Sequence, residues 1–307
     1  MQRHPQFQAY LALAAVCFFW GTTYLGIRIA DETIDPAVLM CLRYTISGII
    51  LLAVACFSKA HLPSGRELWY TALYGVIIIG GGTGCLVFAE QWVPSGLAAV
   101  FITLSPFWMT GIDALIPGGE RLHGPTSLAM LVGLAGTTLL VAPEIMREGF
   151  SGPLLRGFLL LQVGCAAWAL GSMLQRRHQT KAHPVVSGAV QQLATGLAFA
   201  VPAMLARPHP SAWSTRSIGA VVYLVIFGSI VGYSAYIIAL ERLPVSVVSI
   251  YNYVNPVIAV CLGWLFFREH IGLQEVTAML IIFFGVALVK RYSRPPSPRP
   301  ARASAAS

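Results

Sequence analysis

Long apolar runs separated by short polar segments dominate the chain. Each run is close to the about 20 residues that a helix needs to cross about 30 Å of hydrocarbon. Backbone groups in lipid must pair within their own segment, which favours helices, and a β-barrel would instead show alternating segments of about ten residues. The pattern predicts an all-α membrane protein with ten transmembrane helices, at residues 8–28, 36–57, 69–89, 95–116, 126–143, 155–175, 184–205, 217–239, 245–267 and 272–290.

Composition supports this class and argues against two others. Of the 307 residues, 56% are hydrophobic and only 10% are charged, whereas a soluble domain carries about 25% charged residues. Too few polar residues remain to cover a surface that faces water. The net charge of +8 could indicate a nucleic-acid partner, but the basic residues form no stripe with interleaved aromatic residues, so no nucleic acid is expected.

The basic residues also predict the orientation in the membrane. Thirteen of the 20 Lys and Arg residues lie on the side of the N-terminus, six lie on the other side, and Arg43 lies within a span. Because positive loops stay in the cytoplasm, we expect an inner-membrane protein with both termini cytoplasmic. The tail at 292–307 is rich in Pro, Ser and Arg and is expected to be disordered.

The second half of the chain repeats features of the first half at an offset of 148–150 residues. Such ordered matches indicate an internal repeat, at residues 8–145 and 155–291. Five spans is an odd number, so the second copy enters the membrane from the opposite side. Two inverted five-helix repeats are typical of transporters, with the binding site where the halves meet. The matching pairs include Trp20 and Trp168, Pro36 and Pro184, Pro94 and Pro244, Pro106 and Pro256, and Glu120 and Glu269.

Several of these positions carry a resemblance to a known family. The segments concerned are Phe19-Trp20-Gly21-Thr22-Thr23-Tyr24, Arg43 seven residues after Pro36, Ala89-Glu90-Gln91 before Pro94-Ser95-Gly96, Trp168-Ala-Leu-Gly-Ser172, and Tyr253-Val254-Asn255-Pro256 followed by Glu269. With them the chain resembles the ten-helix members of the drug/metabolite transporter superfamily that have two EamA domains. The resemblance implies export of amino acids or other metabolites. The same fold serves nucleotide-sugar and phosphosugar exchange, but the later spans lack the paired Lys or Arg residues that would hold a phosphate.

The ninth span contains the densest group of polar and aromatic residues. Tyr251 and Asn255 share one helix face because they are four residues apart. Pro256 has no N–H to donate and crowds the carbonyl of Asn252. We interpret this as a polar patch that faces a cavity at a bend; in the alternative interpretation, the Asn side chains join helices through backbone hydrogen bonds.

Aromatic residues in the middle of other spans extend this patch. Interfacial tryptophans lie at the ends of spans, so the midspan Trp20 and Trp168 either line a cavity or pack against neighbouring helices. Aromatic rings with a few polar groups suit a small amphipathic solute. The predicted cavity residues are Trp20, Thr23, Tyr24, Tyr74, Phe88, Trp168, Tyr233, Tyr236, Tyr251, Asn252 and Asn255.

Two prolines and two charged residues are further candidates. Pro106 and Pro256 are predicted hinges, although Ser and Thr hydroxyls can simply repair such bends. Arg43 is a candidate to bind a substrate carboxylate; alternatively it pairs with, or extends outward to, Asp35 or Asp31, since a charge within the membrane is costly. Glu90 is a candidate to take up a proton or bind an amine, or is an interfacial residue.

Other motifs in the chain indicate a structural role and no catalytic or binding role. The run Gly80-Gly-Gly-Thr-Gly84 is not followed by the Lys of a phosphate loop, so we expect it to allow close helix packing. The six cysteines all lie within apolar runs and are expected to be neither disulfides nor metal ligands. No catalytic set can be grouped, so an enzyme is disfavoured and no cofactor or metal is expected.

The sequence therefore predicts a secondary transporter that moves a small organic metabolite, such as an amino acid, by alternating access. Its partners would be the small-molecule substrate and the lipid bilayer. The alternatives are an exchanger of nucleotide sugars or phosphosugars, or, in another class, a membrane scaffold that transports nothing. Substrate, transport direction, coupling ion and oligomeric state do not follow from the sequence.

Overall fold

The computed structural model describes residues 5–58, 60–93, 98, 101–116, 123–148, 152–178, 180–206, 212–258 and 272–292, and the regular structure in these ranges is helical. Six helices are long and apolar enough to cross a membrane: Gln6–Ala30, Pro36–Phe57, Gly65–Ala89, Gly152–Arg177, Pro184–Leu205 and Thr215–Arg242. They confirm six of the predicted spans. The total of ten stays a prediction, because the ninth span continues into residues outside the described ranges.

Local sequence explains where two equivalent helices begin. Helix α2 (Pro36–Phe57) starts after Asp35, whose Oδ1 accepts a hydrogen bond from the N–H of Ala37 at 2.8 Å. Helix α9 (Pro184–Ala198) starts in the same way after His183. Each has a proline in its first turn, where the missing N–H leaves no hydrogen bond unmade. The prediction that Pro36 and Pro184 each open a span is confirmed.

Two membrane helices contain a π-helical segment in the middle. In the third span, α3 (Gly65–Gly75), η1 (Val76–Thr83) and α4 (Gly84–Ala89) follow one another directly. In the eighth, α11 (Thr215–Tyr223) leads through η2 (Leu224–Tyr233) into α12 (Ser234–Arg242). The two π segments begin 148 residues apart, which is the offset of the sequence repeat. Such segments occur often at functional sites.

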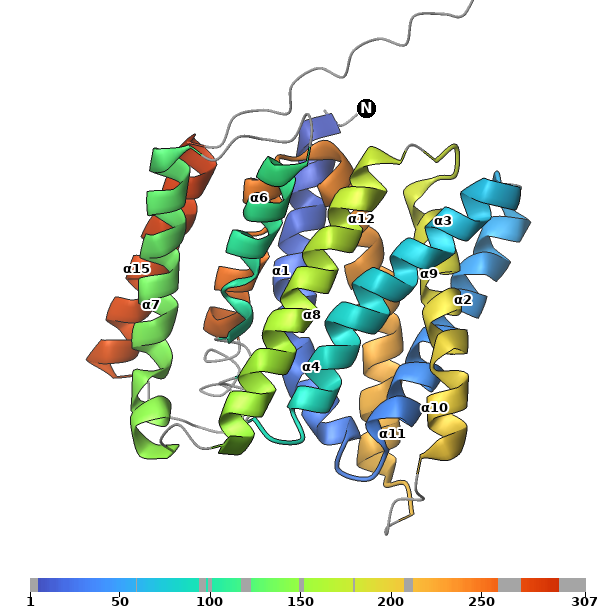
Figure 1. The fold of residues 1–307 in the computed structure, drawn as a ribbon, viewed down its shortest axis with the longest axis horizontal. Coiled ribbons are helices and arrows are strands. Elements are labelled where there is room, and N and C mark those ends of the chain that lie inside the picture. The colour runs from blue at the N-terminus through green and yellow to red at the C-terminus, as the bar shows by residue number, and fades with distance from the viewer. Residues whose placement is uncertain are drawn as a thin grey trace, which may run out of the picture.

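Helices from the two halves pack against each other in pairs. Helices α2 and α9 lie side by side, with so little room that a Cβ on Gly48 would be 2.6 Å from the backbone nitrogen of Leu193. At one edge of the molecule, α7 (Gly124–Glu148) pairs with α15 (Leu273–Tyr292) (Figure 1). There a Cβ on Gly285 would be 2.6 Å from the nitrogen of Gly133.

The glycine run of the third span packs against α8 (Gly152–Arg177). A Cβ on Gly81 would lie 2.7 Å from Cβ of Ala167, and one on Gly82 would lie 2.6 Å from Cε3 of Trp168. The prediction of close helix packing at Gly80–Gly84 is confirmed. The contact holds the Trp168 ring against η1.

The predicted hinge prolines lie near interruptions of their helices. Pro106 is in the first turn of α6 (Ser105–Leu115), directly after a turn at 103–104. Pro256 lies in the helical stretch 251–258, which follows α13 (Val245–Val248) and a turn at 249–250.

Other predictions fall outside the described residues. Pro94, Glu120 and Glu269 are among these positions, as is the tail beyond Tyr292.

A short helix, α10 (Ala200–Leu205), completes the seventh span, and α1 (Pro5–Ala30) forms the first. The cysteines within the described ranges are free thiols.

Candidate functional site

A cavity lies between α1, η1, α8, η2 and the helical stretch 251–258. It contains about 740 Å³ of empty space, counting the part that opens to the surroundings. Both π segments contribute to its wall, through Ile79, Gly82 and Thr83 on η1 and through Gly228 and Tyr233 on η2. The cavity is therefore built from both halves of the chain.

Aromatic rings form one wall of this cavity. The Trp20 ring lies edge-on to Trp168, with 5.3 Å between centroids, and to Tyr251, with 5.1 Å between centroids. Nε1 of Trp20 donates to the carbonyl oxygen of Gly228 at 2.9 Å, which fixes the ring against η2. The two midspan tryptophans thus line the cavity and also pack against each other, so both interpretations offered for them apply.

The two asparagines of the ninth span have different roles. Nδ2 of Asn255 donates to the carbonyl oxygens of Cys17 (3.0 Å) and Tyr251 (2.9 Å), and so joins this helix to α1. Nδ2 of Asn252 donates to Ser249 O at 3.1 Å, but its Oδ1 is buried and has no hydrogen-bond partner. A buried acceptor without a partner is costly. Asn252 therefore brings a buried acceptor without a partner to the wall of the cavity.

Arg43 supplies a positive charge at the same cavity. The side chain is 4% exposed, its Nε donates to Oγ of Ser229 at 2.8 Å, and its Nη1 has no hydrogen-bond partner. It does not extend outward to Asp35, whose carboxylate caps α2. A Cβ on Gly228 would be 2.7 Å from Nη2 of Arg43, so this glycine makes room for the guanidinium.

Eight of the eleven predicted cavity residues line this cavity: Trp20, Thr23, Tyr24, Trp168, Tyr233, Tyr251, Asn252 and Asn255. Three do not. Tyr236 is fully buried behind the wall, where its hydroxyl accepts from Trp168 Nε1 at 2.9 Å and bonds Ser172 at 2.7 Å. Tyr74 faces a second cavity and is hydrogen-bonded to His178, and Phe88 contributes to neither.

Sequence reasoning missed other parts of the wall. Tyr44, next to Arg43, and Cys165, three residues before Trp168, line the cavity, as do Ile79, Gly82, Thr83 and Gly228 of the π segments. For Gly228 the repeat offset was an available signal, because it aligns this residue with Gly80 of the glycine run. Nothing in the apolar pattern distinguishes a π segment from an α-helix.

Two acidic residues lie together where α1 and α4 end. Glu90 is 7% exposed, and neither of its carboxylate oxygens has a hydrogen-bond partner. Burial raises the pKa of Glu90 well above its usual range, and the charge of Asp31 raises it further. Burial likewise raises the pKa of Asp31 to about 8, against the effects of a hydrogen bond from Gln91 and the charge of Arg28. The carboxyl group of Asp31 can therefore hold a proton near neutral pH, and burial shifts the pKa of Glu90 in the same direction.

A bundle of apolar helices around a partly polar central cavity defines a multi-pass membrane protein that can accommodate a small solute. The sequence model of the EamA-like transporter family matches this chain at residues 7–142 and again at 155–291. The chain belongs to the EamA-like transporter family, within the drug/metabolite transporter superfamily.

Individual relatives agree with this assignment. The chain is 33% identical over 280 residues to "Uncharacterized inner membrane transporter YedA" of Escherichia coli (strain K12), which covers 91% of this chain and 89% of that protein. It is 22% identical over 292 residues to "WAT1-related protein At3g02690, chloroplastic" of Arabidopsis thaliana, covering 92% and 69%. A solved structure titled "Crystal structure of protein" has the same fold, with a TM-score of 0.76 and 24% identity over 92% of this chain and 97% of that chain.

Proposed function

We propose that the protein is a secondary transporter that exports small zwitterionic metabolites, amino acids in particular. The observation that carries this proposal is a pair of unpartnered groups in one cavity, Nη1 of Arg43 and Oδ1 of Asn252. A guanidinium pairs well with a carboxylate, and an amide oxygen accepts from an ammonium group. The wall formed by Trp20, Trp168 and Tyr251 offers apolar contact to the rest of the solute.

Alternating access would arise from two inverted five-helix repeats, at 8–145 and 155–291, that rock against each other. Two observations support this: the family model matches the chain twice, and the two π segments keep the repeat offset. The bends near Pro106 and Pro256 would act as hinges. The name of the Escherichia coli relative and the distribution of basic residues support an inner-membrane location with both termini in the cytoplasm.

The chemistry of the cavity disfavours the phosphate-bearing alternative. Among the described residues that line it, Arg43 is the one basic side chain. A phosphoryl group carries up to two negative charges and would leave one of them uncompensated in a buried site. A carboxylate balances the single guanidinium.

The test is uptake of labelled amino acids and of labelled nucleotide sugars into proteoliposomes that contain the purified protein. We expect amino-acid transport that is lost, by at least about tenfold, in Arg43→Gln and Asn252→Ala, since each removes a charged or buried hydrogen bond of about 1.5–3 kcal/mol. Thr138→Val, at an exposed position of α7, is the matched control and should transport normally. Full transport by both cavity variants would exclude this site, and exchange of nucleotide sugars alone would favour the alternative function.

A further inference from the structure

A second cavity lies at the end of the bundle where α3 begins and α8 ends. It contains about 720 Å³ of empty space, counting its open part, and lies between α3, α8 and α9. Its wall includes Arg66, Tyr70, His178, Ser187 and Gln191. Neither the family assignment nor the central cavity accounts for this grouping.

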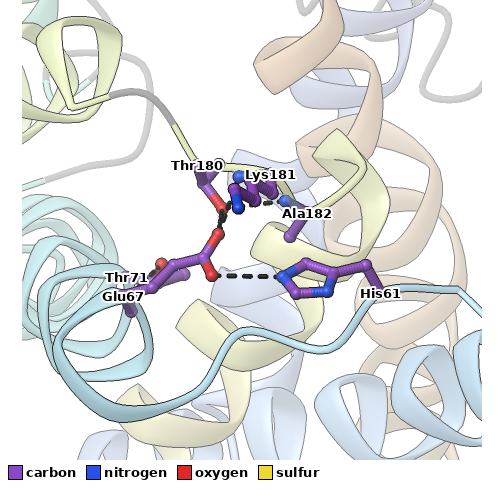
Figure 2. A network of polar contacts seen from close by, with 6 residues as sticks. All are labelled: His61, Glu67, Thr71, Thr180, Lys181 and Ala182. Atoms are coloured by element: carbon purple, nitrogen blue, oxygen red, sulfur yellow. Dashed lines mark hydrogen bonds and ion pairs between the residues drawn. The ribbon is translucent and has the colours of Figure 1, made fainter. Parts of the chain in front are cut away.

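Polar contacts of Glu67 join the chain segments around this second cavity (Figure 2). Its Oε1 accepts from the hydroxyl of Thr180 and from the backbone N–H of Lys181 at 2.7 Å, and its Oε2 lies 3.2 Å from Nε2 of His61. These contacts tie α3 to the segment between α8 and α9. They also give both oxygens of the Glu67 carboxylate a partner.

The interior of the second cavity contains a donor with no partner. Ser187 is 2% exposed, lines the cavity, and has no hydrogen-bond partner for its hydroxyl. Two aromatic rings lie on the same cavity, because the ring centroids of Tyr70 and His178 are 4.5 Å apart, with the ring planes tilted by 38°. The guanidinium of Arg66 lies 5.9 Å from the centroid of Tyr70. The cavity thus combines a cation, a buried hydroxyl and an aromatic face.

One side chain links the wall of the second cavity to the wall of the central one. Nε2 of Gln191 donates to Oε1 of Gln175 at 3.0 Å, and its Oε1 accepts from the hydroxyl of Tyr233 at 2.7 Å. Gln191 and Gln175 line the second cavity, whereas Tyr233 lines the central one. Rotation of the Gln191 amide would break these hydrogen bonds and change the contact between the walls of the two cavities.

We propose that this second cavity is a binding site for a small carboxylate-bearing solute, which passes from it to the central cavity when Gln191 releases Gln175. Arg66 receives the carboxylate, Tyr70 and His178 contact the rest of the solute, and Ser187 donates the buried hydrogen bond. Arg66 is the one Lys or Arg side chain among the described residues that line this cavity, and both oxygens of the neighbouring Glu67 carboxylate already have hydrogen-bond partners. The passage between the cavities rests on the proposed transport function; the binding site does not.

Chemical labelling of Ser187→Cys tests the binding site without any transport measurement. The probes are sulfonatoethyl methanethiosulfonate, which is anionic, and trimethylammonioethyl methanethiosulfonate, which is cationic. Modification of this cysteine is followed by mass spectrometry in the otherwise natural chain. Relative to their rates with a free thiol, we expect the anionic reagent to react at least about fivefold faster, because the guanidinium of Arg66 attracts anions. Arg66→Gln should abolish this preference, and benzoate should slow the reaction where neutral benzamide does not.

The control is Thr195→Cys, on the same helix and fully buried away from both cavities. It should stay unmodified. The binding site is excluded if the cysteine at 187 does not react in the folded protein, if the cationic reagent reacts faster, if Arg66→Gln changes nothing, or if the cysteine at 195 reacts equally well.

Transport separates the two proposals. If amino-acid transport depends on Asn252 while Ser187→Ala and Arg66→Gln leave its KM unchanged, the second cavity is not on the route and the proposed passage is wrong. If no amino acid is transported but the labelling preference is observed, the proposed function fails and the binding site stands.

Discussion

At the scale of single residues, the central cavity depends on side chains that are buried without full hydrogen bonding. Arg43 and Asn252 each have one polar atom that lacks a partner. Proteins satisfy nearly all buried polar groups, so exceptions usually have a functional reason. A solute with a carboxylate and an ammonium group would supply both missing partners.

The close approach of Arg43 to Gly228 gives a prediction at this scale. In Gly228→Ala the new methyl group would lie 2.7 Å from Nη2 of Arg43, so the flexible guanidinium must move. We expect a folded protein that is destabilised by about 1–3 kcal/mol and binds its solute several-fold more weakly. Binding and thermal denaturation of the purified variant check this. Gly111→Ala, with open space at its Cβ, should change neither quantity.

The buried carboxyl of Asp31 predicts how stability depends on pH. Its pKa is raised to about 8 in the folded protein, compared with about 3.9 when unfolded. Between these two pKa values the folded state holds a proton that the unfolded state has released, so the contribution of Asp31 to stability is full below about pH 4 and is lost as the pH rises through about 8. Arg28, Asp35, Gln91 and Glu90 are the neighbours that modulate this effect.

The measurement is the thermal midpoint between pH 5 and pH 9. We expect a fall of a few degrees as the pH rises towards 8, and a smaller fall in Asp31→Asn, which cannot ionise. An identical pH dependence in the two proteins would contradict this assignment.

At the scale of secondary-structure elements, glycines set how closely the two halves approach. Gly48 lets α2 contact the backbone of α9 at Leu193, and Gly75 does the same for α3 at Gln191. In lipid there is little hydrophobic driving force between helices, so close packing through small residues contributes much of their association.

Gly48→Ala tests this packing. A methyl group 2.6 Å from the backbone nitrogen of Leu193 cannot be relieved by turning a side chain, so the helices must separate. We expect a loss of about 1–3 kcal/mol of stability, which a denaturation series in mild detergent would detect. Gly219→Ala is a suitable comparison, because no atom lies near its Cβ. Equal stability of the two variants would show that α2 and α9 are not held together at this point.

The sequence predicts the helical elements better than their internal geometry. Apolar runs locate the spans, and Asp35 before Pro36 identifies a helix start, because both depend on local chemistry. The surroundings of Tyr74 could not be predicted in this way. Its depth along the span and its bond to His178 depend on how α3 crosses α8, which one helix does not encode by itself. The unpartnered oxygen of Asn252 likewise depends on which helices surround it.

At the scale of the whole molecule, Gln191 links the walls of the two cavities, and hydrogen bonds to Glu67 tie α3 to the α8–α9 segment at one end of the bundle. Transport by alternating access requires such ties to form and break in turn. Because the Glu67 tie joins α3 in the first half to the α8–α9 segment in the second, its loss should favour opening at this end.

Cys165 provides a natural reporter of that opening, because its thiol lines the central cavity and is 5% exposed. We expect Glu67→Ala to raise its rate of modification by N-ethylmaleimide several-fold, measured peptide by peptide. Thr71→Val is the matched comparison, since the Thr71 hydroxyl bonds only to the Glu67 carbonyl of its own helix. A rate that is unchanged in Glu67→Ala would mean that this tie does not restrain the bundle.

The paired π segments also constrain how the length of the chain can vary. A π-helix closes its hydrogen bonds one residue further along than an α-helix does, so each segment accommodates extra chain within an otherwise regular span. Deleting one residue from an α-helical part of either span would turn everything beyond it by about 100°. Deleting one from 76–83 would instead let that stretch become α-helix and leave Glu90 and the end of α4 close to their present neighbours. We therefore expect a one-residue deletion to impair the protein less within the two π segments than elsewhere in these spans.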